Sequence, residues 1–189
     1  MSEFPIIGLV GPPASGKSEV ASLLEIKGAE RVRMGDIVWK EVEERGMELN
    51  EENVGKVANR MRQENGMDAV AKKIIPIVEE RMECNPVVVD GIRGIAEVKR
   101  FRNFFGEKFV LVAVVASVKT RYDRVERRGR KDDIDDFESF KKKEEREFGW
   151  GLEKAIEASD FEVRNEGSRE ELRREVEEVF GEVISRHGN

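Results

Sequence analysis

Eight residues near the start of the chain have the types and spacing of a phosphate-binding loop. They read Gly-Pro-Pro-Ala-Ser-Gly-Lys-Ser, run from Gly11 to Ser18 and fit the pattern G-x-x-x-x-G-K-[ST]. A chain that turns from a strand into a helix exposes backbone N–H groups without an intrahelical partner, and the helix dipole adds positive potential there. Pro12 and Pro13 have no N–H, so we expect the phosphate donors to come mainly from residues 14–18.

The same loop predicts what its side chains do. Gly16 lets the backbone come close to a phosphate oxygen, and Lys17 can reach the β- and γ-phosphates of a nucleotide. The Ser18 hydroxyl can ligate Mg²⁺. We therefore expect ATP and Mg²⁺ as cofactors. The residues predicted to bind the nucleotide are Gly11, Pro12, Pro13, Ala14, Ser15, Gly16, Lys17 and Ser18.

A second motif is an apolar strand that ends in a carboxylate, Val87-Val88-Val89-Asp90. This is the form of a Walker B element, in which the aspartate lies beside the phosphate loop and holds Mg²⁺ directly or through water. An apolar strand can also end in Asp because the following turn favours it. The predicted metal ligands are Ser18 and Asp90.

The elements that must position these motifs alternate between strands and helices, as in a parallel α/β sheet. Five apolar segments predict strands: residues 5–10, 31–34, 86–90, 109–116 and 160–164. About fifty residues separate the second strand from the third, far more than a crossover needs. Helical patterns at residues 37–45, 51–64 and 68–82 predict a helical insert there, placed to cover the carboxyl edge where ligands bind in open α/β folds.

Composition excludes several classes of protein. A chain of 189 residues fits one domain, spanning residues 1–189. The net charge of −6 argues against a nucleic-acid partner, and no apolar run is long enough to span a bilayer. The single Cys84 excludes an internal disulfide and indicates a reducing compartment, so we expect a cytoplasmic protein. His187 is the only histidine, which excludes a zinc site or a serine–histidine triad.

Two short motifs resemble elements of the adenylate kinase group of nucleoside monophosphate kinases: Met34-Gly35-Asp36, and Asp90-Gly91-Ile92-Arg93. In that group a T-G-D element opens the acceptor-binding helices, and a D-G-x-P-R element supplies an arginine to the acceptor phosphate. The resemblance implies acceptor roles for Gly35, Asp36 and Arg93.

The chain departs from that group at two positions. Trp39 stands where those kinases carry an arginine, and the proline before the second motif's arginine is missing, so the acceptor stays open. Arg93 could also be a surface arginine paired with a nearby acid. Asp36 could also cap a helix that starts at Ile37.

The whole chain more closely resembles a family of archaeal P-loop proteins related to adenylate kinase, of uncharacterised function. The resemblance covers M-G-D, residues 53–62, V-V-V-D-G-I-R, an arginine-rich segment and residues 165–168. It implies a three-layer α/β P-loop fold of nucleoside monophosphate kinase type. This fold has a five-stranded parallel sheet, a helical acceptor-binding insert over about residues 35–84 and a short lid over about residues 121–146.

The arginine-rich segment resembles the lid of these kinases, whose arginines stabilise the transferring phosphoryl group. The resemblance implies that role for at least one of Arg124, Arg128 and Arg130. The alternative is a solvated helix face with ion pairs, which we also predict for residues 141–145. Asn165 belongs to a turn that resembles one bordering the adenine in dephospho-CoA kinases and adenylate-type kinases. A turn capped by Ser168 explains the same residues.

These observations predict an ATP- and Mg²⁺-dependent phosphotransferase, with ATP and a small nucleotide-like acceptor as its partners. Lys17 would contact the phosphates, and Arg93, with Arg62, would hold the acceptor. A phosphate acceptor needs no base, whereas a hydroxyl acceptor needs a carboxylate, for which Asp36 is the candidate. The alternatives are an adenylate-kinase-like ATPase that acts as an assembly factor or switch, and a protein that only binds nucleotide.

Overall fold

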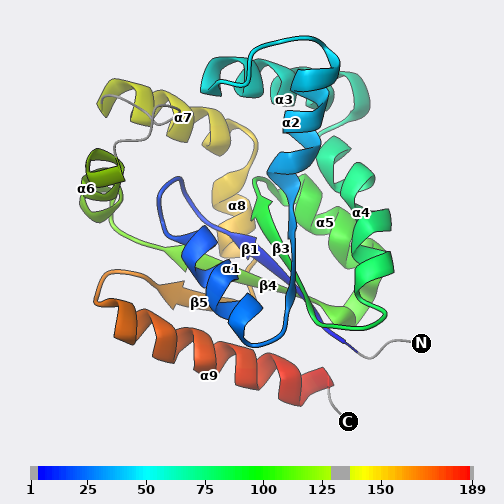
Figure 1. Cartoon of the computed structure of the whole chain (residues 1–189), viewed down its shortest axis with the longest axis vertical. Coiled ribbons are helices and arrows are strands. Elements are labelled where there is room, and N and C mark those ends of the chain that lie inside the picture. The colour runs from blue at the N-terminus through cyan, green and yellow to red at the C-terminus, as the bar shows by residue number, and fades with distance from the viewer. Residues whose placement is uncertain (1–3, 129–136, 188–189) are drawn as a thin grey trace.

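A five-stranded parallel sheet forms the centre of the molecule (Figure 1). The computed structural model describes residues 4–128 and 137–187, and only the backbone of residue 128. The sheet order is β2-β3-β1-β4-β5, and every pairing is parallel, as the sequence predicts. The strands are β1 (Ile6–Val10), β2 (Glu30–Arg33), β3 (Val87–Ile92), β4 (Phe109–Val115) and β5 (Phe161–Arg164).

Helices cover both faces of the sheet, which gives the predicted three layers. Successive residues of a strand point to opposite faces, so Ile6 and Val10 enter one core while Ile7 and Leu9 enter the other. Helices α1 (Lys17–Ile26) and α9 (Arg169–His187) pack on the second face. Helices α4 (Ala69–Arg81), α5 (Ile95–Phe105) and α8 (Leu152–Glu157) pack on the first. Strands buried in this way are continuously apolar.

The helical insert lies between β2 and β3 and consists of α2 (Met34–Glu44), α3 (Glu51–Asn65) and α4. The Asn50 side chain accepts a hydrogen bond from the Asn53 amide (2.9 Å) and so caps α3. Helix α2 begins at Met34, three residues before the predicted start at Ile37. Asp36 therefore lies in the first turn of α2, and the interpretation of Asp36 as an N-cap is wrong.

Two further helices, α6 (Val118–Arg128) and α7 (Phe137–Gly149), follow β4, and a short 3₁₀ turn, η1 (Gly106–Lys108), precedes it. Helix α7 lies at the same end of the sheet as α2 and α3 of the insert, and it faces α3 (Figure 1). A capping box begins α9, since the Glu171 amide donates to Ser168 Oγ (3.2 Å) and the Ser168 amide donates to Glu171 Oε2 (2.6 Å). Within the described part of the chain, no helix has the length and apolar character that a membrane crossing needs.

Candidate active site

The phosphate-binding loop connects β1 to α1 at the centre of the sheet, in the strand–loop–helix context that the motif requires. The loop closes on itself because the Ser15 amide donates to the Pro12 carbonyl (3.2 Å). Ala14 (φ 59°) and Gly16 (φ 102°) adopt left-handed conformations, and alternation of this kind turns successive amides toward one point. The buried Ser15 hydroxyl has no hydrogen-bond partner among the described residues. The loop therefore has the geometry of an anion cradle.

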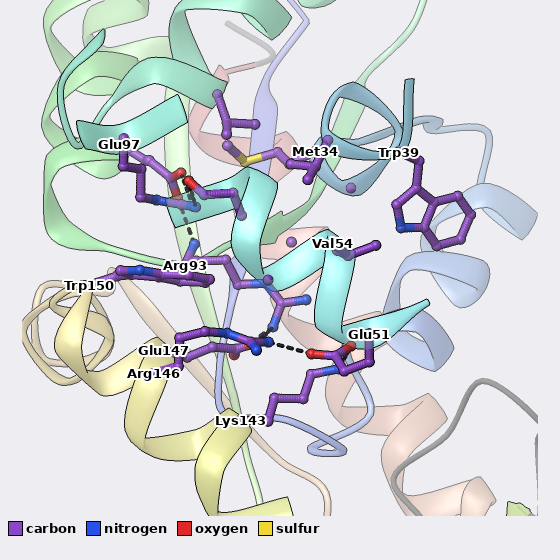
Figure 2. Close-up of a pocket in the computed structure, with 17 residues that line it drawn as sticks. Met34, Trp39, Glu51, Val54, Arg93, Glu97, Lys143, Arg146, Glu147 and Trp150 are labelled. Atoms are coloured by element: carbon purple, nitrogen blue, oxygen red, sulfur yellow. Dashed lines mark hydrogen bonds and ion pairs between the residues drawn. The ribbon is translucent and has the colours of Figure 1, made fainter. Parts of the chain in front are cut away.

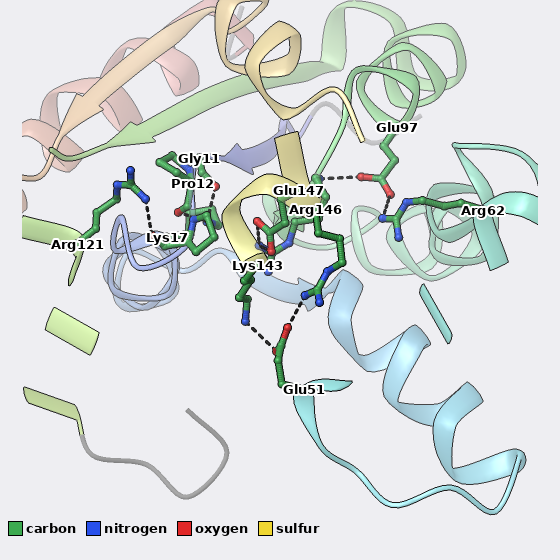
Figure 3. Close-up of polar contacts among 12 residues, drawn as sticks. Gly11, Pro12, Lys17, Glu51, Arg62, Glu97, Arg121, Lys143, Arg146 and Glu147 are labelled. Carbon is green, nitrogen blue, oxygen red and sulfur yellow. Dashed lines mark hydrogen bonds and ion pairs between the residues drawn. The ribbon is translucent and has the colours of Figure 1, made fainter. Parts of the chain in front are cut away.

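The Lys17 ammonium lies over this loop. Lys17 Nζ donates to the Gly11 carbonyl (2.6 Å) and to the Pro12 carbonyl (2.9 Å), and the side chain is 8% exposed (Figure 3). Burial, and then the nearby Arg93 guanidinium, lower the pKa of Lys17 to about 7, although Glu147 and Asp90 oppose the shift. A buried ammonium of this kind is stabilised strongly when an anionic ligand binds beside it.

Two predicted site residues, Asn165 and Arg124, pack against the loop backbone. Asn165 Nδ2 donates to the Ser15 carbonyl (2.9 Å), and Arg124 Nη1 donates to the same carbonyl (3.2 Å). Arg124 Nη2 also donates to the Asn165 backbone and side-chain oxygens (2.7 and 3.0 Å). A Cβ at Gly16 would overlap the Asn165 amide, so this close approach needs glycine.

The roles predicted for these two residues, adenine contact and phosphoryl stabilisation, stay predictions. Of the other lid candidates, Arg128 ends α6 with its side chain outside the described residues, and Arg130 lies outside them entirely.

Arg121 connects the loop, α6 and α7. Its guanidinium donates to the Pro13 carbonyl (3.3 Å) and forms an ion pair with Glu144 (2.6 Å). The side chain is only 4% exposed and lies 5.5 Å from the centre of the Phe140 ring. Within the lid predicted over about residues 121–146, sequence reasoning assigned Arg121 no role of its own, because its partners on the loop and α7 are distant in sequence.

Asp90, a predicted metal ligand, forms an ion pair with Arg31 of the neighbouring strand β2. Arg31 is nearly buried and also lies 3.5 Å from Glu25. Ser18, the other predicted ligand, is exposed in the first turn of α1. Among the described residues no three His, Cys, Asp or Glu side chains gather as a metal site. A Mg²⁺ ion bound largely through nucleotide phosphates needs only one or two protein ligands, so the pair Ser18 and Asp90 fits this use.

A cavity of about 250 Å³ lies between the insert and α7 (Figure 2). One part of its wall is apolar and comes from Met34, Val38, Val54, Ala58 and Val70, and two tryptophans, Trp39 and Trp150, also line it. The rest carries charge, from the cations Arg62, Arg93, Lys143 and Arg146 and the carboxylates Glu51, Glu97 and Glu147. Two residues predicted for the acceptor, Gly35 and Arg93, line this cavity. Asp36 is exposed and is not one of the lining residues.

Arg93 joins the cavity to the phosphate loop. Its Nη1 contacts both carboxylate oxygens of Glu147 (2.6 Å each), and its backbone amide donates to Glu97 Oε2 (2.7 Å). Burial opposes the charge of Arg93, but the carboxylates of Glu147, Asp90 and Glu97 together outweigh burial and raise the pKa of the guanidinium. The sequence left two interpretations of Arg93, an acceptor-binding residue or an arginine paired with an acid. They are compatible, since Arg93 pairs with Glu147 and also lines the cavity.

A second buried pair supports this arrangement from the side of the insert. Arg62 Nη2 contacts Glu97 Oε1 (2.9 Å), with side chains 5% and 1% exposed. Burial outweighs the two arginines near Glu97 and raises the pKa of its carboxyl. The Arg62 guanidinium also lies 4.0 Å from the centre of the Trp150 ring, whose Nε1 donates to Asn59 Oδ1 (2.8 Å).

A third set of charges joins α3 to α7. Glu51 forms ion pairs with Arg146 and with Lys143 (2.9 Å), as Figures 2 and 3 show. Burial opposes the charge of Glu51, yet the two cations outweigh it and lower the pKa of the carboxyl. The prediction of a solvated face for residues 141–145 is wrong for Lys143, which lines the cavity, and for Glu144, which binds Arg121.

Glu147 is the main cavity residue that the sequence reasoning missed. It shares one face of α7 with Phe140, Lys143 and Glu144, at the three- and four-residue spacing of a helix. Phe140 is fully buried, so that face points inward. This periodicity was the available signal, but the abundance of charge in the segment hid it.

Comparison with known proteins agrees with this fold. The model of a family described as an AAA domain matches residues 7–149. The chain is 42% identical to a UPF0200 protein of Methanosarcina barkeri over 179 residues, covering 95% of this chain and 96% of that protein. It is 45% identical to a UPF0200/UPF0201 protein of Archaeoglobus fulgidus over 94% of this chain, but spans only 55% of that longer relative.

Solved structures share the fold at low sequence identity. TT1252 from Thermus thermophilus has a TM-score of 0.67 at 21% identity, covering 95% of this chain and 97% of that one. A dephospho-CoA kinase from Campylobacter jejuni has a TM-score of 0.60 at 14% identity, covering 98% of each chain. A gluconokinase from Sinorhizobium meliloti has a TM-score of 0.59 at 15% identity, covering 100% of this chain and 95% of that one. This likeness establishes a P-loop kinase fold.

Proposed function

The chain belongs to the UPF0200 family of P-loop proteins, and we propose that it is an ATP- and Mg²⁺-dependent kinase. Its substrate is a small, nucleotide-like molecule bound in the cavity between the insert and α7. One observation carries this proposal. Arg93 lines the cavity and directly follows Ile92, which pairs with Val10 immediately before the phosphate loop. The phosphate end of a nucleotide on the loop would therefore meet a molecule in the cavity.

The residues present divide into two groups on this proposal. The loop amides and Lys17 bind the β- and γ-phosphates, while Arg124 and Asn165 keep the loop in shape through its Ser15 carbonyl. Ser18 and Asp90 would hold Mg²⁺, which supplies further charge stabilisation of the phosphates. Arg93 holds the acceptor beside the γ-phosphate, and positioning of this kind can supply much of the rate enhancement.

Two features support a small acceptor. The cavity, at about 250 Å³, is slightly smaller than the roughly 300–1,000 Å³ typical of small-molecule sites. Two of the similar structures are, by name, a gluconokinase and a dephospho-CoA kinase. Both charged and apolar groups line the cavity, which suits a molecule with a polar reacting end and an apolar or planar body.

The test is transfer of the labelled γ-phosphate of ATP to a panel of nucleoside monophosphates, nucleosides, dephospho-CoA and gluconate. The wild-type protein should label at least one acceptor. Lys17→Ala should lower both ATP affinity and transfer, whereas Lys27→Ala should not. Lys27 is the matched control, because it follows the same helix and its ammonium forms an ion pair with Glu177 on α9 (3.0 Å), away from the phosphate loop. Unchanged ATP affinity in Lys17→Ala would contradict the proposal.

A second candidate function is an ATPase that acts as an assembly factor or nucleotide-dependent switch. One observation favours it. Among the described residues, the cations of the cavity are already paired with carboxylates from other elements, and Glu51 with Arg146 and Lys143 joins α3 to α7. Breaking such pairs on nucleotide binding could change the surface offered to a macromolecule. Phosphate release without any labelled acceptor, stimulated by a macromolecule, would identify this function.

A further inference from the structure

We propose that Glu147 is the carboxylate that accepts the acceptor's proton, so that the molecule phosphorylated presents a hydroxyl group and not a phosphate. This inference rests on the proposed kinase function and narrows the class of its substrate. It also replaces Asp36, the base candidate from the sequence, with a residue of α7.

The position of Glu147 supports this role. Its side chain is buried (2% exposed) yet lines the cavity, and its carboxylate binds the guanidinium of Arg93. Its charge is also close enough to Lys17 to oppose the lowering of the pKa of that lysine. Lys17 marks where the γ-phosphate lies. A hydroxyl in the cavity that faces this phosphate would therefore be next to Glu147. Asp36, in contrast, is exposed at the start of α2 and is not among the residues that line the cavity.

The other two carboxylates of the cavity each bind two different donor groups, whereas Glu147 binds one within the described part of the chain. Each oxygen of Glu51 has its own cation, Arg146 on Oε1 and Lys143 on Oε2. The oxygens of Glu97 accept from Arg62 and from the Arg93 amide.

Both oxygens of Glu147 share the single Nη1 group of Arg93, which is the only donor to this carboxylate among the described residues. A carboxylate has about four lone-pair sites. Glu147 thus keeps acceptor capacity for a hydroxyl.

Charge also favours a hydroxyl over a phosphate. An acceptor phosphate at Arg93 would have to displace a carboxylate held at 2.6 Å and would lie beside its negative charge. A neutral hydroxyl does neither, because it donates a hydrogen bond to Glu147 and leaves the pair with Arg93 intact. The arrangement therefore selects against phosphate acceptors and is suited to alcohols.

The reaction balances with the groups named. The acceptor oxygen forms a bond to the γ-phosphorus, and the bond from that phosphorus to the bridging oxygen of ADP breaks, with its electron pair remaining on ADP. The proton of the hydroxyl passes to Glu147, which later releases it to solvent. The products are a phosphate monoester, ADP and one proton.

The experiment compares wild type, Glu147→Gln and Glu147→Asp, with Glu145→Gln as the control on the same helix, where Glu145 is exposed. ATP affinity, thermal unfolding, ATP hydrolysis with water as the acceptor, and transfer to nucleosides, dephospho-CoA, gluconate and AMP are measured. Glu147→Gln should keep ATP affinity within about threefold and lower hydrolysis and hydroxyl transfer about 100-fold or more. Glu147→Asp keeps a carboxylate and should exceed the Gln variant by about tenfold.

Three results overturn the inference while leaving a kinase in place. The first is turnover by Glu147→Gln within about threefold of wild type. The second is transfer to AMP that rises when Glu147 is replaced, which would make Arg93 a phosphate site blocked by this residue. The third is loss of turnover in Asp36→Asn but not in Glu147→Gln. Failure of the proposed function itself differs, since the wild-type protein would then transfer phosphate to no acceptor in the panel, whether or not it hydrolyses ATP.

Discussion

Raising the pH from 7 to 9 should weaken ATP binding about fiftyfold, because Lys17 then loses its proton. The pKa of this lysine is about 7 in the ligand-free protein, lowered first by burial and then by the Arg93 guanidinium. Phosphate oxygens interact with the ammonium form and not with the neutral amine. The affinity should therefore be fully present below pH 7 and be lost as the pH rises through this value.

The magnitude follows from the proton equilibrium. If only the ammonium form binds, the apparent Kd is multiplied by the factor 1 + 10^(pH − pKa), where the pKa is that of Lys17 in the ligand-free protein. This factor is about 2 at pH 7 and about 100 at pH 9, which gives the fiftyfold ratio. At pH 8 about nine in ten unliganded molecules lack the proton, so binding should take up about 0.9 proton.

Titration calorimetry in two buffers of different ionisation heat measures both the affinity and the proton uptake. Arg93→Met offers a second arm, because removal of this cation should raise the Lys17 pKa and move the affinity loss to higher pH. Lys27→Ala should leave the profile unchanged. A Kd that stays within about threefold from pH 7 to pH 9, with no proton uptake at pH 8, would refute the argument.

Two further predictions concern stability. Arg62→Met should lower the free energy of unfolding by about 3–5 kcal/mol, because it leaves the Glu97 carboxylate buried without its ion-pair partner. Denaturant unfolding measures this loss. The double variant Arg62→Met/Glu97→Gln should recover part of the lost stability. Gly94→Ala should lower the free energy of unfolding by about 1–3 kcal/mol, because a Cβ at this position overlaps the Trp150 carbonyl. A Cβ at Gly181 in α9 has no atom of the described residues within contact distance, so Gly181→Ala should raise the free energy of unfolding by about 0.5–1 kcal/mol. Equal melting temperatures for the two alanine variants would contradict the packing at Trp150.

The strands and the phosphate loop could be predicted because their signals are local. Residues 87–89 and Phe109–Val115 are continuously apolar, as strands buried on both faces are. The strand predicted at residues 31–34 is present at Glu30–Arg33, although it carries Arg31. The predicted start of α2 was three residues too late, because the sequence Met-Gly-Asp is more typical of a turn than of the first turn of a helix.

The cavity could be anticipated only in part. The resemblance to nucleoside monophosphate kinases implied acceptor roles for Gly35 and Arg93, and both line the cavity. Glu147 was missed, because its segment is rich in charge and was interpreted as a solvated face. The contact between Glu147 and Arg93 joins residues that are 54 positions apart in the sequence, so no local pattern predicts it.

The sequence by itself determined the binding loop, the order of strands and helices along the chain and the existence of the insert, since each depends on neighbours within a few residues. Only the tertiary structure decided which charges meet. With 40 acidic and 34 basic residues, almost any pairing is compatible with the sequence. Coulomb attraction does not distinguish one carboxylate from another, so the choice of Glu147 for Arg93 and of Asp90 for Arg31 depends on which elements pack together.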